Sequence, residues 1–164
     1  MNTLTGFAEL LERTSVAASA TAALDTAAAL IEREAKAEIG SYQRSNLGPY
    51  DPWAELAQAT KDERVRLGFT PNDPLLRTGE LRDSIGRQVE GLEAVIGSTS
   101  DVMVYQELGT SRIPPRPVLG LAAIRKNRDV LRLIGNGLGA AMFAKWLGRP
   151  APAHLEVSSI PDAE

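Results

Sequence analysis

The sequence predicts an α+β fold in which a long N-terminal helix and a broken C-terminal helix pack on a small, mostly antiparallel β-sheet. Three observations predict it. An alanine-rich helical segment covers residues 15–39, short β-prone segments follow between residues 84 and 108, and a second apolar helical pattern covers residues 118–147. A length of 164 residues fits one domain with a modest core.

The first helix is expected over residues 15–39, because alanine is the best helix former and Gly40 supplies a stop. Small apolar residues recur there at steps of three and four and so share one narrow face. Such a face suits close packing against a helix, a sheet or another copy of the chain. The residues on it are Val16, Ala20, Leu24, Ala27, Ile31, Ala35 and Ile39.

Residues 40–74 are expected to form a loop-rich lobe. Glycine, proline, asparagine and serine between residues 40 and 53 disfavour regular structure, and residues 69–74 read as a turn. Between these loops, a polar helix is predicted from Trp53 to about Leu67, ending at Gly68.

A small sheet is predicted in the middle of the chain. Residues 84–89 and 94–97 are short β-prone segments joined by a plausible hairpin turn at residues 90–93. Residues 102–108 fit either a strand or a helix, with the β-branched start favouring a strand. The prolines between residues 114 and 117 then exclude a helix and predict a rigid extended link.

The last helix is expected over residues 118–147, with Gly135, Gly137 and Gly139 weakening or kinking its middle. We therefore expect a single domain over residues 1–149. Residues 150–164 show no period, and we expect them to be flexible or ordered only against a partner.

Charge is unevenly distributed along the chain, whose net charge is −3. Residues 112–149 hold eight basic and one acidic side chain, a net charge of +7. This basic segment meets either the acidic segments of its own fold or of a neighbouring copy, or nucleic acid, and the first interpretation is the simpler one. No apolar run approaches the length of about 20 residues that a membrane span needs, and residues 1–14 lack the apolar region of a secretory signal.

Catalytic, cofactor-binding and metal-binding residues are not predicted. The chain has no cysteine, and its only histidine, His154, lies in the proline-containing tail. These parts do not make a usual zinc site or a nucleophile–base pair. The glycines of residues 135–139 lack the spacing of a phosphate-binding loop. We therefore expect no enzyme and no cofactor.

Several short motifs occur in a fixed order along the middle of the chain. Trp53 and Leu56 form W-x-x-L and are followed by Thr60 and Arg64. Then come L-x-T-G-x-L-x-x-S-I at residues 76–85, V-I-G-S at 95–98, Y-x-E-x-G-T at 105–110 and P-x-R-P-x-L at 114–119.

This order resembles the tail-completion and minor-tail-component proteins of tailed phages, also called the phage virion morphogenesis family. The resemblance covers residues 50–122. It implies a structural subunit of the virion, assembled in the host bacterial cytoplasm, in the tail or at the head–tail junction. It also implies a homo-oligomeric ring, with six subunits expected, that contacts other neck or tail proteins such as the connector or stopper, the tail terminator and the tail tube.

Two roles stay open for the basic segment in that setting: a head-to-tail contact with an acidic neighbour, or a lining of the channel through which DNA passes. The alternative function is a stand-alone nucleic-acid-binding module that uses residues 112–149. Low aromatic content and net acidity count against this alternative. No membrane partner is expected.

The candidate interface or motif residues follow from these patterns. Gly79 is expected to cap a short helix together with Thr78, and Gly109 to let the chain reverse. Arg116 is held between prolines, and Glu107 is its candidate partner, within one subunit or between two. A structural salt bridge is the simpler of those interpretations. The full set is Trp53, Thr78, Gly79, Leu81, Arg82, Tyr105, Glu107, Gly109, Arg116 and Pro117.

Overall fold

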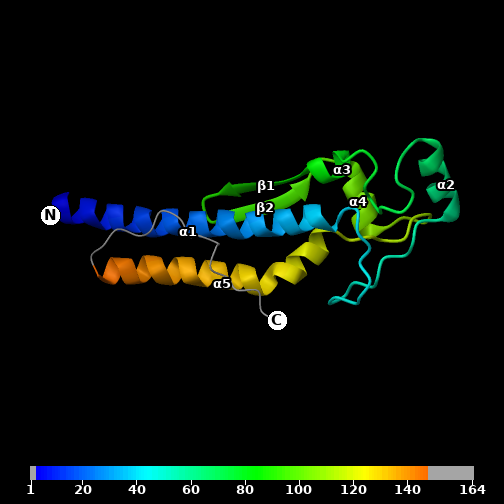
Figure 1. Ribbon diagram of the computed structural model, residues 1–164. Coiled ribbons are helices and arrows are strands. Elements are labelled where there is room, and N and C mark those ends of the chain that lie inside the picture. The colour runs from blue at the N-terminus through cyan, green and yellow to red at the C-terminus, as the bar shows by residue number, and fades with distance from the viewer. Residues whose placement is uncertain (1–2, 148–164) are drawn as a thin grey trace. The chain divides into compact units, whose positions relative to one another are not determined.

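A computed structural model describes the backbone of residues 3–147 and the side chains of residues 16–144 and 146–147. Its fold is α+β, as the sequence predicts (Figure 1). The predicted tail at residues 150–164, with His154, lies outside the described residues. The elements are α1 (Thr3–Glu38), α2 (Gln58–Arg66), α3 (Glu80–Asp83), β1 (Ile85–Glu90), β2 (Glu93–Ser98), α4 (Asp101–Leu108) and α5 (Leu119–Trp146).

The chain divides into two compact units. Unit 1 contains the described parts of residues 1–28, 89–94 and 128–164, and unit 2 contains residues 29–88 and 95–127. The helices α1 and α5 and both strands therefore contribute to each unit. The single domain expected over residues 1–149 stays a prediction.

The N-terminal helix begins earlier than predicted, at Thr3, and ends at Glu38. The predicted stop at Gly40 is confirmed, since this glycine has a φ of 101° and its N–H donates to Pro74 O at 2.8 Å. In unit 1, residues 3–28 of α1 and residues 128–146 of α5 run in opposite directions (Figure 1). Their buried side chains are mostly small: Ala23, Ala27, Ala28, Leu133 and Ala141.

The two strands form an antiparallel hairpin, β1–β2, close to the predicted positions. The turn between them contains Gly91 at a φ of 57°, a conformation that favours glycine. In unit 1, Thr21 Oγ1 lies 2.7 Å from Gly91 O, to which it donates a hydrogen bond. The hairpin turn is thereby fixed to α1.

The predicted start of the polar helix at Trp53 is wrong, because α2 begins at Gln58. Two hydrogen bonds hold the preceding residues out of a helix. Trp53 N–H donates to Gln43 O at 2.8 Å, and Leu56 N–H donates to Tyr42 Oη at 3.0 Å. These partners lie far away in the sequence, so local propensity did not reveal them.

Residues 102–108, for which a strand was the favoured interpretation, lie in helix α4. Asp101 stands in its first turn, where a negative charge is favourable. The last helix, expected to be broken, is one continuous α-helix from Leu119 to Trp146. Each glycine costs a helix only about 1 kcal/mol relative to alanine, which the flanking leucines and alanines offset.

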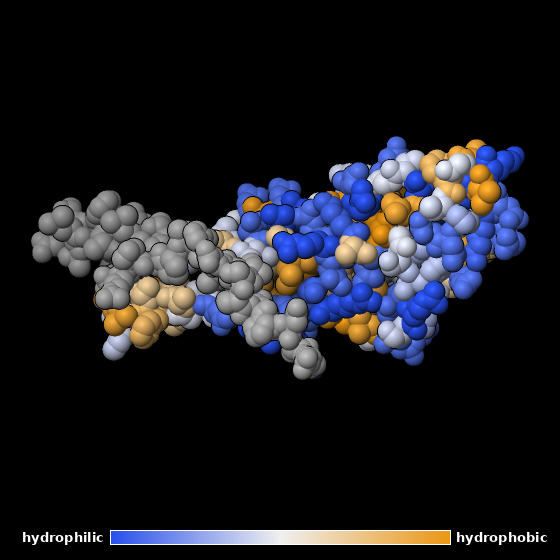
Figure 2. Space-filling view, viewed as in Figure 1, coloured by the Kyte–Doolittle hydropathy of each residue, from blue (hydrophilic) through white to orange (hydrophobic). Residues whose placement is uncertain are grey.

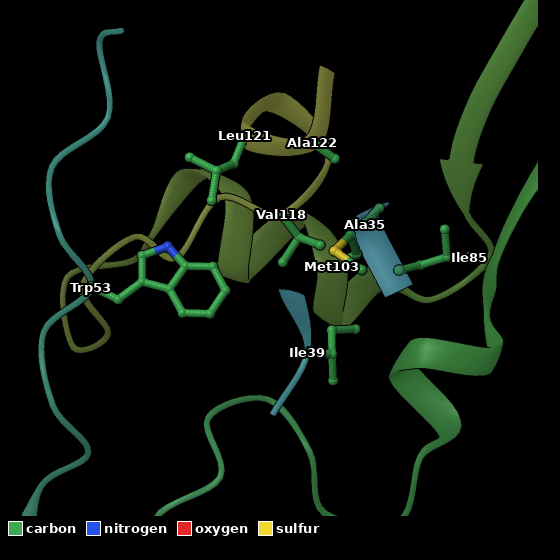
Figure 3. Packing of buried hydrophobic residues seen from close by; sticks show 8 residues of the cluster. All are labelled: Ala35, Ile39, Trp53, Ile85, Met103, Val118, Leu121 and Ala122. Atoms are coloured by element: carbon green, nitrogen blue, oxygen red, sulfur yellow. The ribbon is translucent and has the colours of Figure 1, made fainter. Parts of the chain in front are cut away.

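The core of unit 2 gathers side chains from helices, a strand and a loop (Figure 3). Trp53 comes from the loop before α2 and points toward Val118 and Leu121 at the start of α5. Both aliphatic residues are fully buried, and Trp53 is 5% exposed. Trp53 therefore anchors the loop before α2 onto the start of α5. The cluster consists of Ala35, Ile39, Trp53, Ile85, Met103, Val118, Leu121 and Ala122.

Among the described residues, no helix combines the length and the apolar character needed to cross a membrane.

Candidate functional site

A cavity of about 730 Å³ lies in unit 2, between the loop after α2, helix α3, helix α4 and the proline-containing link before α5. Motif residues that are far apart in the sequence line it together. Its apolar wall consists of Leu56, Phe69, Leu75, Leu81, Val102 and Ile113. Its polar and charged wall includes Thr60, Arg64, Arg77, Thr78, Glu80, Ser100, Gln106 and Arg116.

Arg64, on α2, is 8% exposed and organises the loop that forms one side of the cavity. Its Nη1 donates to Asp73 O at 2.7 Å and to Leu76 O at 2.9 Å, with Thr70 O at 3.4 Å. Charged hydrogen bonds of this kind are stronger than neutral ones. They support a loop in which Leu75 has a φ of 62°, a conformation that a leucine adopts only when its surroundings impose it.

Arg116, the predicted motif arginine, is 5% exposed and also lines the cavity. Its Nη2 donates to Ala54 O at 2.9 Å, so it ties the link before α5 to the segment that follows Trp53. Within the described residues, its Nε has no hydrogen-bond partner. Burial lowers the pKa of Arg116, the nearby Tyr42 raises it and the charge of Arg64 lowers it, but a guanidinium stays protonated in proteins.

Glu107 does not pair with Arg116, so the predicted salt bridge within one subunit is wrong. Glu107 Oε1 instead accepts the N–H of Val118 at 2.8 Å and the N–H of Leu119. These amides lie at the start of α5, where N–H groups lack helical partners and negative charge is favourable. Glu107 is therefore the cap of the last helix. The alternative, a pair between Glu107 and Arg116 of two subunits, stays a prediction.

The predicted cap of the short helix α3 is present in part. Gly79 has a φ of 93° and stands at the N-cap position, and Thr78 Oγ1 lies 3.5 Å from Glu80 N, a long hydrogen bond. Leu81 packs against the core cluster. Arg82 is exposed and pairs with its neighbour Asp83 at 3.2 Å, a contact that contributes little.

Three further motif residues have structural positions outside the cavity lining. Gly109 has a φ of 71°, and a Cβ there would lie 2.9 Å from Pro115 N, so the chain reversal requires glycine. Pro117 is buried. Tyr105 is 53% exposed on α4, on the same helix as the exposed Leu108.

Two cations of the basic segment, Arg125 and Lys126, are paired with carboxylates within unit 2. Arg125 Nη1 lies 2.5 Å from Glu38 Oε1 and 3.4 Å from Glu34 Oε1, and Lys126 Nζ lies 3.3 Å from Glu34 Oε2. Burial raises the pKa of Glu38, and the charge of Arg125 opposes that shift. The interpretation that this segment meets the acidic residues of its own fold is thus confirmed for these two cations.

Sequence reasoning missed two features of this site. Arg64 was noticed only as part of a motif, although its side chain is buried and organises a loop. Gln106 was not singled out, yet its Oε1 is buried without a partner among the described residues and it lines the cavity. No sequence pattern marks either feature, because it is the fold that brings the carbonyl groups to Arg64 and forms the cavity beside Gln106.

The described residues contain no group of three His, Asp or Glu side chains arranged to hold a metal ion. Comparison of the chain with protein-family models, with curated proteins and with solved structures gave no match.

Proposed function

We propose that this chain is a non-enzymatic structural subunit of a tailed-phage particle, placed in the tail or at the head–tail junction. In this proposal, copies form a ring, with six subunits expected, between the connector and the tail tube. Other neck or tail proteins, such as the stopper and the tail terminator, are its further partners.

The observation that carries the proposal is the joint placement of the motif residues. The T-G-x-L, Y-x-E-x-G-T and P-x-R-P elements, by which the sequence resembles the tail-completion family, pack around one cavity and its immediate supports. Arg116 binds backbone carbonyls, Glu107 caps α5 and Gly109 permits a tight reversal. These roles set the shape of a surface and supply no reacting group, which suits a protein that acts by contact.

Exposed apolar side chains supply surfaces for such contacts. On α5, Met142 is 66% exposed, Phe143 60% and Trp146 78%. Figure 2 shows apolar atoms gathered over this end of the helix. Large aromatic side chains dominate the energetics of protein–protein contacts, and a monomer rarely leaves several of them together in water.

The ion pairs of Arg125 and Lys126 reduce the positive charge that the basic segment offers to DNA phosphates. This favours the structural role over the nucleic-acid-binding module.

Light scattering coupled to sizing chromatography, over a wide range of protein concentration, tests the proposal. We expect one closed oligomer of uniform mass, because the proposed ring repeats one heterologous contact whose rotation closes. A chain that stays monomeric at all concentrations, and that binds duplex DNA with a steep salt dependence, would contradict the proposal and favour the nucleic-acid-binding module.

A further inference from the structure

The cavity of unit 2 carries positive charge that the described residues do not neutralise. Neither Arg64 nor Arg116 forms an ion pair with a carboxylate among the described residues, and both satisfy part of their donors with backbone carbonyls. Arg77 shares a loose 3.9 Å contact with Glu63, and Glu80 is the one carboxylate in the lining. The wall therefore favours an occupant with negative charge.

Two residues of the lining also hold a buried polar atom that lacks a partner within the described residues: Arg116 Nε, a donor, and Gln106 Oε1, an acceptor. Leaving such groups unpaired costs about 1–3 kcal/mol each. A carboxylate in the occupant pairs with the charge of the arginines that line the cavity. The apolar wall around them calls for aliphatic side chains. The fitting occupant is therefore a peptide segment that combines carboxylates with aliphatic residues.

One segment of the chain itself has this chemistry. Residues 150–164 contain three carboxylates, at Glu156, Asp162 and Glu164, and no lysine or arginine. The same segment carries three aliphatic side chains and two serines. These are Leu155, Val157, Ile160, Ser158 and Ser159.

We infer that the cavity binds residues 155–164 of a second copy of this chain. The assignment to a second copy rests on the proposed ring, in which each subunit contacts one neighbour through one surface and the other neighbour through a different surface. A cavity that receives the segment of a neighbour is one half of such a contact, and the segment is the other half. The carboxylates would face Arg116 and Arg77, and the aliphatic residues would cover the wall formed by Leu81 and Val102.

The experiment uses full-length chains. A photoreactive benzoylphenylalanine replaces Leu155 in unlabelled protein, which is mixed with nitrogen-15-labelled protein and irradiated, and cross-linked peptides are then identified by mass spectrometry. We expect cross-links to peptides that contain residues 74–82 or 100–108, carried by the labelled copy.

Two neighbouring positions on α4 give a matched pair of variants. Val102 lines the cavity and is 48% exposed, whereas Val104 is 54% exposed and is not among the lining residues. Val102→Glu in the labelled copy should lower the cross-link yield roughly tenfold, because like charges oppose binding at an interface. Val104→Glu should leave the yield unchanged.

A second variant protects the test against misfolding at Val102. Replacing Glu156, Asp162 and Glu164 together by lysine in the photoreactive copy should lower the yield to a similar extent. Three outcomes would overturn the inference: cross-links confined to the unlabelled copy, cross-links to other parts of the chain, or equal yields for Val102→Glu and Val104→Glu. Sizing chromatography of the same samples separates the two proposals. A closed ring without these cross-links contradicts only the inference about the cavity. These cross-links in a dimer contradict only the proposed ring.

Discussion

The two compact units bury different kinds of side chain. The core of unit 2 contains Trp53, Met103, Val118 and Leu121, which are large and well enclosed. The buried positions of unit 1 are mostly alanines, and Leu133 is the large exception among those described. Burying apolar area stabilises a fold in proportion to that area, at about 25 cal/mol per Å². Among the described residues, unit 2 therefore buries the larger apolar side chains.

The two units also differ in the apolar side chains that they expose. In unit 1, the last turns of α5 present Met142, Phe143 and Trp146 at 60% exposure or more, with Phe143 and Trp146 stacked at 5.9 Å between ring centroids. In unit 2, α4 exposes Val102, which lines the cavity, and also Val104, Tyr105 and Leu108, which are not among the lining residues. Among the described residues, unit 2 thus combines a core of large side chains with a cavity, whereas unit 1 combines a core of small side chains with a cluster of exposed apolar ones.

The largest expected effect is in the core of unit 2. Trp53→Ala should lower the free energy of unfolding by about 3–5 kcal/mol, because it opens a cavity next to Leu121. The indole Nε1 has no hydrogen-bond partner among the described residues, so Trp53→Phe should cost much less. Urea unfolding measures both, with Val65→Ala on the exposed face of α2 as the control. Equal losses for the alanine and phenylalanine variants would show that packing is not what Trp53 supplies.

The next effect separates a structural role of Arg116 from a paired one. Arg116→Glu should lower the free energy of unfolding by about 3 kcal/mol, because a carboxylate cannot donate to Ala54 O and is buried beside carbonyl oxygens. Adding Glu107→Arg should make the loss larger, since it also removes the cap of α5. If the double variant is more stable than Arg116→Glu alone, Glu107 and Arg116 do form the predicted charge pair, and the structural role is contradicted.

A smaller effect is expected for the cap itself. Glu107→Ala should cost about 1–2 kcal/mol, and Glu107→Gln less, because glutamine keeps one acceptor for the amides of Val118 and Leu119. Amide hydrogen exchange measured by NMR checks the mechanism. Those two amides should exchange faster in the alanine variant, while amides in the middle of α5 keep their rates. Unchanged exchange at both amides would rule out the capping role.

The smallest effect concerns the ion pairs of α1 within unit 2. Hydrogen bonds from Lys36 and Arg87, each at 2.6 Å, lower the pKa of Glu32 from its ordinary value of 4.5. The stabilisation is thus fully present above about pH 4.5 and is lost as the pH falls through the lowered pKa of the folded state. Glu32→Gln should cost at most about 1 kcal/mol at pH 7.

Thermal melts as a function of pH measure this effect. The difference between the wild-type chain and Glu32→Gln should shrink toward zero as the pH falls well below 4.5. Glu93→Gln, at an exposed glutamate of β2, is the control. A difference that stays constant down to acid pH would mean that the carboxylate charge of Glu32 contributes nothing.

Local signals predicted much of this fold. Alanine content and Gly40 located the first helix and its end, and β-prone segments around Gly91 located the hairpin. The start of α2 was predicted wrongly because Trp53 N–H and Leu56 N–H bond to Gln43 and Tyr42, and such distant partners leave no local pattern.

The motif residues of the site were found in sequence, but their partners were not. Two opposite charges nine positions apart, Glu107 and Arg116, read as an ion pair. In the fold, each instead bonds to backbone groups: Glu107 to the first amides of α5 and Arg116 to the carbonyl of Ala54. Arg64 is the same case. Backbone groups are invisible in a sequence, so bonds from buried side chains to them are the part of a site that pattern reasoning misses.

Hydrogen–deuterium exchange of the full chain, at concentrations well below and well above that of self-association, tests the difference between the two units most directly. We expect residues 131–146 of α5 to gain protection only at the higher concentration, because their exposed apolar side chains become covered. Residues 29–39 and 119–127 of unit 2 should be protected equally at both. The same protection of residues 131–146 at both concentrations, in samples shown to have associated, would contradict the account.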